Sequence, residues 1–148
     1  MELHPAERDL LFTARRAVLA TINDRGTARL VPIAYAPAVT NDGVVIYSAL
    51  DEKAKTVADP RDLARVRDLR QRPRVTVLVD HWDENWLALA WLRMEGTATL
   101  IEPTDPPAHH AEGIRLLRER YPQYAEHALE TRPLIRIDVD RVSSWAAA

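Results

Sequence analysis

The chain has 148 residues, of which 47% are hydrophobic and 28% are charged, a composition typical of one globular domain. The net charge of −2 and the lack of cysteine exclude disulfides, thiolate metal sites, thiol nucleophiles and a global attraction to nucleic acid or anionic membranes. A charged N-terminus and the lack of a long apolar run favour a cytoplasmic protein without a membrane partner. No Gly-x-Gly-x-x-Gly or phosphate-loop motif occurs, so a Rossmann or Walker nucleotide site is not expected.

The first part of the chain is predicted to form a helix and then a β-hairpin. Apolar residues at helical spacing predict a helix over residues 6–15. Strands are expected at 17–22 and 28–35, joined by an Asn-Asp-Arg-Gly turn. Proline cannot donate a hydrogen bond to a β-ladder, so Pro32 must lie on an edge strand or at a bulge. Two interpretations are open for Val31, Pro32 and Ile33: an ordinary core or edge strand, or a flat apolar wall suited to a tricyclic ring.

A third strand is expected at 44–49, after a loop at 37–43, and it leads into a turn that carries Lys53 and Lys55. These are the only two lysines, against eighteen arginines. Residues two apart on an extended segment project to the same side, so the two ammonium groups are predicted to grip a phosphate or carboxylates. The alternative is a solvated basic loop. The strand ends in three further candidates for lining this site, Tyr47, Ser48 and Ala49.

The rest of the chain is expected to supply two helices and three strands. Helices are predicted at 62–72 and 106–120, and strands at 74–80, 86–102 and 134–142. Arg65 on the first of these helices joins the anion site if that helix folds back. The strand at 86–102 is expected to bend near Gly96. Its row of Trp91, Arg93 and Glu95 is predicted to meet a ligand or another subunit.

Six strands that come mostly as hairpins predict a mainly β, single-domain fold spanning residues 1–148, a six-stranded antiparallel barrel with two to three peripheral helices. Closure or dimerisation would cover the strand edges of so small a sheet. His81, Asp83 and Glu84 do not have a recognised metal-ligand spacing, so no metal is expected. No nucleophile–base pattern is present, and any chemistry is expected from a cofactor rather than from side chains.

Several segments together resemble a known family. The opening A-R-R-A-V-L-A-T-I-N-D-R-G-T-A-R-L-V-P-I-A-Y is similar to the first hairpin of the pyridoxamine 5′-phosphate oxidase-like split-barrel superfamily. The branch that it resembles is the F420-dependent one, in the flavin/deazaflavin oxidoreductase group. That narrower likeness rests on the later segments I-Y-S-A-L-D-E-K-A-K, L-A-R-V-R-D-L-R-Q-R-P-R-V-T-V-L-V-D, W-L-A-L-A-W-L-R-M-E-G-T-A and R-Y-P-Q-Y-A-E-H.

This resemblance implies a six-stranded split β-barrel, a homodimer, and a cofactor groove between the subunits. By position, Lys53 and Lys55 match the phosphate grip, and residues 31–33 match the strand beside the ring. Residues 47–49 match the strand that leads into the phosphate turn. Trp91 and Arg93 fall where the partner subunit approaches the ring. The substrate-phosphate residues near the C-terminus of pyridoxamine phosphate oxidases are not found, so that reaction is not expected.

The function that the resemblance implies is hydride transfer between coenzyme F420 and a small activated organic substrate, with a proton from water or from Tyr47. An FMN-binding oxidoreductase of the same fold and a non-catalytic cofactor-binding module are the alternatives. Nucleic-acid binding is the weakest reading, because the basic excess is local and lacks interleaved aromatic residues.

Overall fold

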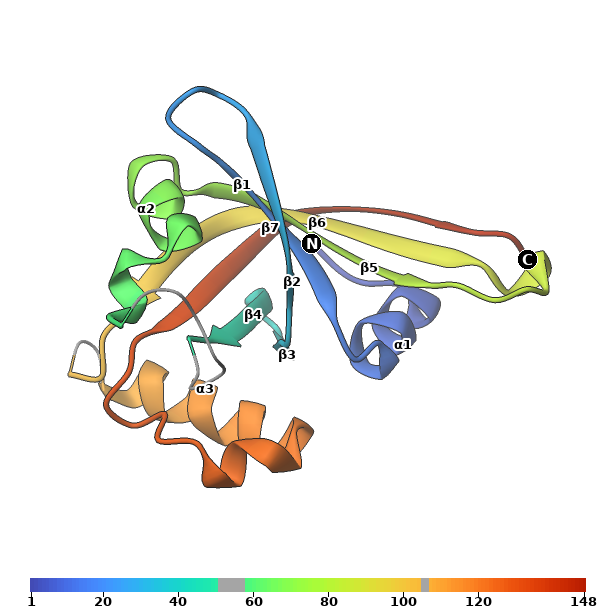
Figure 1. Ribbon diagram of the computed structural model, residues 1–148. Helices are drawn as coiled ribbons and strands as arrows, with labels where there is room; N and C mark the ends of the chain where they lie inside the picture. The colour runs from blue at the N-terminus through green and yellow to red at the C-terminus, as the bar shows by residue number, and fades with distance from the viewer. Residues whose placement is uncertain (51–57, 105–106) are drawn as a thin grey trace.

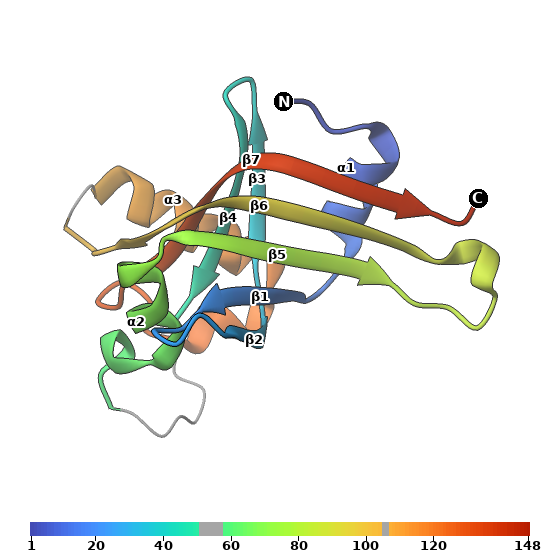
Figure 2. The same ribbon diagram turned by 90° about the horizontal axis from the view of Figure 1, so that it is seen from above.

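A computed structural model describes residues 1–50, 58–104 and 107–148. Within these ranges, seven strands form one antiparallel sheet in the order β2–β1–β5–β6–β7–β4–β3, and three α-helices surround it (Figures 1 and 2). The strands are β1 (Ala17–Ile22), β2 (Ala28–Ile33), β3 (Ala36–Thr40), β4 (Gly43–Ala49), β5 (Arg74–His81), β6 (Ala90–Ile101) and β7 (Leu134–Ala146). The helices are α1 (Pro5–Thr13), α2 (Ala64–Gln71) and α3 (Pro107–Arg120), with 3-10 turns at Pro60–Asp62, Trp86–Ala88 and Pro122–Glu126. No helix of the described residues is long and apolar enough to span a membrane.

The two edge strands of the sheet, β2 and β3, follow one another in the chain. Only Ala34 and Tyr35 connect them, so the sheet must curl until its edges approach each other. The sheet stays open between these edges, which fits the expected split barrel. Pro32 lies on an edge strand, as its missing N–H predicts.

The prediction of six strands was wrong by one. Residues 36–40 form β3 instead of a loop, and they pair along β4 from Ala36 opposite Tyr47 to Thr40 opposite Gly43. The Ala-Pro-Ala start of β3 has no clear alternation of apolar and polar residues, so the sequence does not mark it as a strand. Pro37 is tolerated because β3 is an edge strand and pairs on one side alone.

The long strand β6 starts later than predicted but bends where expected. Residues 86–88 form a 3-10 turn, because the Asn85 side chain accepts a hydrogen bond from the Leu87 N–H at 3.2 Å. The register then shifts between Glu95 and Gly96, which is a β-bulge. A Cβ on Gly96 would lie 2.9 Å from the Asp138 carbonyl carbon, so the two strands can approach this closely only at a glycine.

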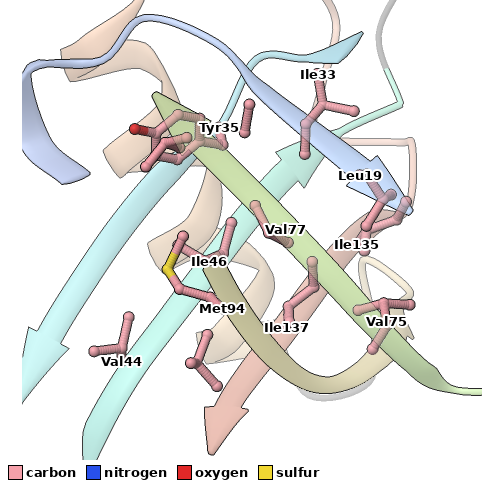
Figure 3. Close-up of a cluster of buried hydrophobic side chains, with 14 of the residues drawn as sticks. Leu19, Ile33, Tyr35, Val44, Ile46, Val75, Val77, Met94, Ile135 and Ile137 are labelled. Carbon is pink, nitrogen blue, oxygen red and sulfur yellow. The ribbon is translucent and has the colours of Figure 1, made fainter. Parts of the chain in front are cut away.

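The main core lies on the concave side of the sheet, where α1 and α2 also pack. Alternating residues of β5 point into it, and Val75, Val77 and Val79 are at most 4% exposed. Figure 3 shows side chains from β1, β2, β4, β5, β6 and β7 meeting in this cluster. Full burial of each such side chain is worth about 1.5–3 kcal/mol. A second cluster lies between α3 and the strands β3, β4 and β7.

Candidate functional site

A cavity of about 330 Å³ opens beside the edge strand β2, and we call it the β2 pocket. Among the described residues that line it, three are arginines and none is a carboxylate. The remaining surface comes mostly from the apolar edge of β2 and from the end of β4. The described lining residues are Arg15, Arg16, Val31, Pro32, Ile33, Ala34, Ser48, Ala49, Arg65 and Tyr124.

The two strands that form the pocket walls are tied together at its base. The Ser48 hydroxyl donates a hydrogen bond of 3.0 Å to the Ala34 carbonyl oxygen. Ser48 is only 2% exposed, so water does not compete with the Ala34 carbonyl for the hydroxyl proton. This bond holds the end of β4 against the connection between the two sheet edges.

Arg65 reaches the pocket from α2, and a buried carboxylate fixes that helix. Asp68 accepts hydrogen bonds of 2.7 Å from the Thr21 hydroxyl and from Arg29 Nε. Burial by itself raises the pKa of Asp68, but the bonds from Arg29 and Thr21 outweigh it, so the pKa lies below its usual range. The charged carboxylate therefore fastens α2 to the β1–β2 hairpin, three residues after Arg65.

Arg15 and Arg16 reach the pocket from the chain entering β1. An Arg15 guanidinium N–H donates to the Arg120 carbonyl oxygen at 2.5 Å, and the guanidinium lies 4.9 Å from the centre of the Tyr121 ring. The Tyr121 hydroxyl accepts from the Tyr35 N–H at 3.0 Å and lies 2.9 and 3.0 Å from the carbonyl oxygens of Tyr35 and Arg15. The end of α3 thus fixes both the entry to β1 and the β2–β3 connection.

The chain just before and just after residues 51–57 is held by guanidinium groups. Arg132 Nε donates to the Leu50 carbonyl at 2.5 Å, and the Arg132 carbonyl lies 2.6 Å from Nε2 of the buried His110. On the other side, Arg61 donates two hydrogen bonds to Glu102, at 2.5 and 2.8 Å. This bidentate pairing is the main cause that lowers the pKa of Glu102.

The structure brings together six residues that the sequence proposed for a cofactor site. They come from three separate segments and all line the β2 pocket: Val31, Pro32, Ile33, Ser48, Ala49 and Arg65. Lys53 and Lys55 lie outside the described residues. Their role as a phosphate grip stays a prediction.

Tyr47 lies away from the pocket, although its neighbours Ser48 and Ala49 line it. It is 4% exposed and packs in the cluster under α3. Ser48 faces the opposite side of the strand, whereas Ala49 shares the side of Tyr47 and reaches the pocket because it lies at the strand end. Gly113 on α3 leaves room for its ring, since a Cβ there would lie 2.7 Å from Tyr47 Cδ1. Burial raises the pKa of Tyr47, so its hydroxyl is placed and tuned poorly as a proton donor to this pocket.

Sequence reasoning did not assign four of the lining residues. Arg15 and Arg16 form an adjacent basic pair directly before a strand, which is the one signal that singles them out. Ala34 directly follows β2 and extends its apolar wall. Tyr124 belongs to the 3-10 turn after α3, which Arg118 holds through bonds to the carbonyls of Tyr124 and His127. Only the folded chain shows that this turn reaches the pocket.

Trp91 and Arg93 line a different cavity, of about 400 Å³, which we call the Trp groove. The Arg93 guanidinium lies 5.1 Å from the centre of the Trp91 ring. The other lining residues come from β5, the β5–β6 connection, the start of β6 and the end of β7: Leu78, Asp80, His81, Trp82, Leu89, Ala90 and Trp145.

The β2 pocket and the Trp groove border one continuous face of the sheet, which we call the outer face. The strand register places Pro32, Val18, Leu78 and Arg93 side by side in a row across four strands. Directly paired residues project to the same side of a sheet. The row therefore runs from the pocket wall to the groove, and large apolar side chains on this face and on the β5–β6 connection are exposed: Leu30 66%, Leu78 37%, Trp82 66%, Trp86 69% and Trp145 47%.

Comparison with known proteins decides the family. A family model described as pyridoxamine 5′-phosphate oxidase matches residues 3–146, nearly the whole chain. The chain belongs to this family. A search of curated protein sequences gives no match.

Solved structures similar to this member of the pyridoxamine 5′-phosphate oxidase family share its fold. A conserved hypothetical protein from Mycobacterium tuberculosis is 24% identical, with a TM-score of 0.71 over 99% of this chain and 87% of that one. The heme storage protein HutZ from Vibrio cholerae is 14% identical, with a TM-score of 0.68 over 99% and 95% of the two chains. An FAD-binding protein from Mesorhizobium loti is 19% identical, with a TM-score of 0.63 over 96% and 94%. At these identities the likeness concerns the fold alone.

The β2 pocket of this pyridoxamine 5′-phosphate oxidase family member suits a flat ligand that carries negative charge. Apolar side chains of one strand supply a wall, and three guanidinium groups supply positive charge. Among the described residues, no three His, Asp or Glu side chains gather as metal ligands. The chemistry of the lining is therefore that of binding a planar anion.

Proposed function

We propose that this protein is an oxidoreductase module that binds a flavin-type cofactor in the β2 pocket. Coenzyme F420 is the cofactor that we favour, and the reaction is hydride transfer between it and a small activated organic substrate. The observation that carries the proposal is the pairing of an apolar wall on β2 with three arginines among the described lining residues of the cavity. The family membership of the chain, and the fold that it shares with an FAD-binding protein, support it.

The residues present fit such a group. A volume of about 330 Å³ lies within the usual range of cofactor sites, about 300–1,000 Å³. Val31, Pro32 and Ile33 would lie against the ring, since their edge is free of a further strand on that side. Arg65, together with Lys53 and Lys55, would hold the phosphate. Charge-assisted hydrogen bonds of this kind are worth about 1.5–3 kcal/mol each.

When bound, the cofactor supplies the hydride chemistry, and the chain supplies position and charge. Arginine is not deprotonated in proteins, so the three guanidinium groups hold charge and move no proton. The Ser48 hydroxyl already donates to Ala34, so its oxygen is left to act as an acceptor. Tyr47 faces α3. Water entering the open pocket is then the source of any proton that the substrate takes up.

The choice of F420 rests on the resemblance to the F420-dependent branch and on the two lysines of the 51–57 segment. F420 carries a phosphate followed by an acidic tail, whereas FMN carries a single phosphate. A run of several cations therefore suits F420 better than FMN. Titration of the purified protein with F420 and with FMN, followed by fluorescence, tests this choice. Micromolar or tighter F420 binding is expected. Tight FMN binding without F420 binding would leave the FMN-dependent oxidoreductase as the function.

A non-catalytic cofactor carrier is the second candidate. The observation that favours it concerns the described lining residues: arginines and a hydroxyl engaged with Ala34 provide much of their polar surface, and none of them is a carboxylate or a histidine. One protein with the same fold is described as a heme storage protein. Tight cofactor binding without turnover of enones, quinones or tetrapyrroles would support the carrier.

We also propose that the protein is a homodimer and that the outer face is its interface. This face joins the β2 pocket to the Trp groove, and it exposes Leu30, Leu78 and Trp145 to solvent. Contiguous apolar surface of this kind marks an interaction site. A second copy on this face would cover the open side of the pocket and exclude water from it. Sedimentation at a series of protein concentrations measures the association.

A further inference from the structure

Four residues on the outer face occupy the corners of a near-square. Leu78 on β5 pairs with Arg93 on β6, and Asp80 pairs with Trp91. Corners on one strand are about 6.6 Å apart, and neighbouring strands lie about 4.8 Å apart. Figure 2 shows β5 and β6 side by side, between β1 and β7. The opposite charges Asp80 and Arg93 therefore lie on one diagonal, and the apolar Leu78 and Trp91 lie on the other.

The two charges of this square do not neutralise each other within the chain. Asp80 and Arg93 are both exposed, and no described residue forms an ion pair or a side-chain hydrogen bond with either of them. The Arg93 guanidinium lies 5.1 Å from the centre of the Trp91 ring instead. Both charges line the Trp groove. A partner that covers this groove must therefore supply one cation and one anion.

A second copy of the chain supplies both charges through a single symmetry operation. In a closed dimer of identical chains, a two-fold axis makes every contact reciprocal. Two copies of one face meet when this axis lies in the plane between them. An axis along the diagonal from Leu78 to Trp91 exchanges the other two corners of the square. Asp80 then lies against the partner's Arg93, and Arg93 lies against the partner's Asp80.

The other simple axes of the square give mismatched contacts. An axis along the diagonal from Asp80 to Arg93 places each charge against its own copy, and like charges repel. An axis parallel to the strands places Asp80 on the partner's Trp91. An axis across the strands places Arg93 on the partner's Trp91. Both of these bury charges without an opposite charge beside them, which is strongly destabilising.

The apolar residues around the square also fit the axis from Leu78 to Trp91. Both of these residues lie close to the axis, so each meets its own copy. Trp145 pairs with Trp91 on β7, and the same operation brings it toward the partner's Leu89, two residues before Trp91. The strands of the two copies cross at roughly a right angle, which is one of the two usual ways in which sheets pack face to face.

Resting on the outer-face dimer proposed above, we propose that its two-fold axis follows the diagonal from Leu78 to Trp91. Two reciprocal ion pairs between Asp80 of one copy and Arg93 of the other then fix how the two sheets are oriented. Complementary charges across an interface set register and suppress wrong arrangements. The two copies close each other's Trp groove, so the groove is part of the interface and holds no separate ligand.

Charge reversal in two variants tests the ion pairs. Asp80→Arg alone and Arg93→Asp alone each place like charges together at both pairs. Each is expected to raise the dissociation constant of the dimer about ten- to a hundredfold, measured by analytical ultracentrifugation. In an equimolar mixture, each variant chain meets opposite charges on the other at both pairs. The mixture is therefore expected to form a mixed dimer with a dissociation constant within about threefold of the unaltered one.

Introduced cysteines test the position of the axis, because the chain has none of its own. Leu78→Cys lies near the axis, so a short bismaleimide is expected to join two copies of this variant. Ser143→Cys is the matched control, since Ser143 pairs with Arg93 and lies in the same row of the sheet. The axis separates Ser143 from its own copy by more than about 10 Å along the face, so no crosslink is expected.

Asp42→Arg and Arg25→Asp are the controls for net charge, because they make the same reversals in exposed turns outside the outer face. Both are expected to leave association unchanged. A mixture that stays as weak as its two components, or crosslinking through Ser143→Cys and not through Leu78→Cys, would overturn this inference while the outer-face dimer stands. A monomeric unaltered protein would overturn the dimer and this inference together. Cofactor binding is not a readout, so a failed F420 or FMN titration leaves this result intact.

Discussion

The Ser48 hydroxyl donates a hydrogen bond of 3.0 Å to the Ala34 carbonyl oxygen, and this single bond joins the end of β4 to the link between the two edges of the sheet. Ser48→Ala leaves that part-buried carbonyl without its side-chain donor. We expect a loss of about 1–2 kcal/mol in the free energy of unfolding, measured by urea denaturation. Cofactor affinity should fall as well, because both walls of the β2 pocket depend on this contact. An affinity that falls without any loss of stability would show that Ser48 acts on the ligand and not on the walls.

The buried Asp68 makes the stability of the protein depend on acid pH. Its pKa is lowered in the folded state, so it stabilises the fold above the ordinary value of 3.8, and this contribution is lost as the pH falls below it. Asp68→Asn should lower the free energy of unfolding by about 1–3 kcal/mol at pH 7, because Arg29 and Thr21 then share a neutral acceptor. The difference in the free energy of unfolding between the unaltered protein and Asp68→Asn should become smaller as the pH falls from 5 to 3. Asp24→Asn in the exposed turn is the control, and a change above about 0.5 kcal/mol there would point to a general charge effect.

Two glycines should differ in their tolerance of a methyl group. At Gly96 the added carbon meets the backbone of Asp138, which cannot move without breaking the β6–β7 pairing. At Gly113 it meets the side-chain carbons Leu134 Cδ1 at 2.6 Å and Tyr47 Cδ1 at 2.7 Å, which can shift. We expect Gly96→Ala to lower the free energy of unfolding by about 3 kcal/mol or more. Gly113→Ala should lower it by only about 1 kcal/mol, because the higher helix propensity of alanine offsets part of the clash. Urea denaturation measures both losses of stability. A larger loss for Gly113→Ala than for Gly96→Ala would contradict the contacts described.

The sequence predicted the elements with strong periodicity and failed where the signal was weak. The valines of β5 and the alternating residues of β6 mark buried faces directly. The strand β3 was not predictable, because its Ala-Pro-Ala start carries no alternation and is stabilised by its pairing with β4. The apolar wall of the pocket was predicted from Val31, Pro32 and Ile33. Arg16 and Tyr124 were not, since their approach to β2 depends on how α1 and α3 pack against the sheet.

A charged residue in the middle of the outer face should separate the proposed dimer. Leu78 is 37% exposed and lies in the row that links the β2 pocket to the Trp groove. Leu78→Asp is expected to raise the dissociation constant of the dimer about ten- to a hundredfold, because it buries an unpaired charge. Analytical ultracentrifugation measures the change. Phe12→Asp on α1 also replaces an exposed apolar side chain by a charge and should leave association unchanged; a monomeric unaltered protein would refute the dimer.

The Tyr121 hydroxyl should hold the backbone at Arg15 and Arg16 in place beside the pocket. It accepts from the Tyr35 N–H and lies 3.0 Å from the Arg15 carbonyl oxygen. Tyr121→Phe removes these bonds and should cost about 1–3 kcal/mol in the free energy of unfolding. The chain at Arg15 and Arg16 should then open more often, so trypsin should cut there faster under native conditions.

Mass spectrometry of the tryptic fragments checks this, with the cut after Arg25 in the exposed β1–β2 turn as the internal reference. Tyr35→Phe is the comparison variant. Burial raises the pKa of Tyr35 to about 12, so its hydroxyl stays protonated and donates to the Leu11 carbonyl oxygen at 2.5 Å. Its loss should destabilise the protein but leave the Tyr121 bond to the Arg15 carbonyl in place. If both variants speed cleavage at Arg15 and Arg16 equally, the entry is held by overall stability and not by the Tyr121 hydroxyl.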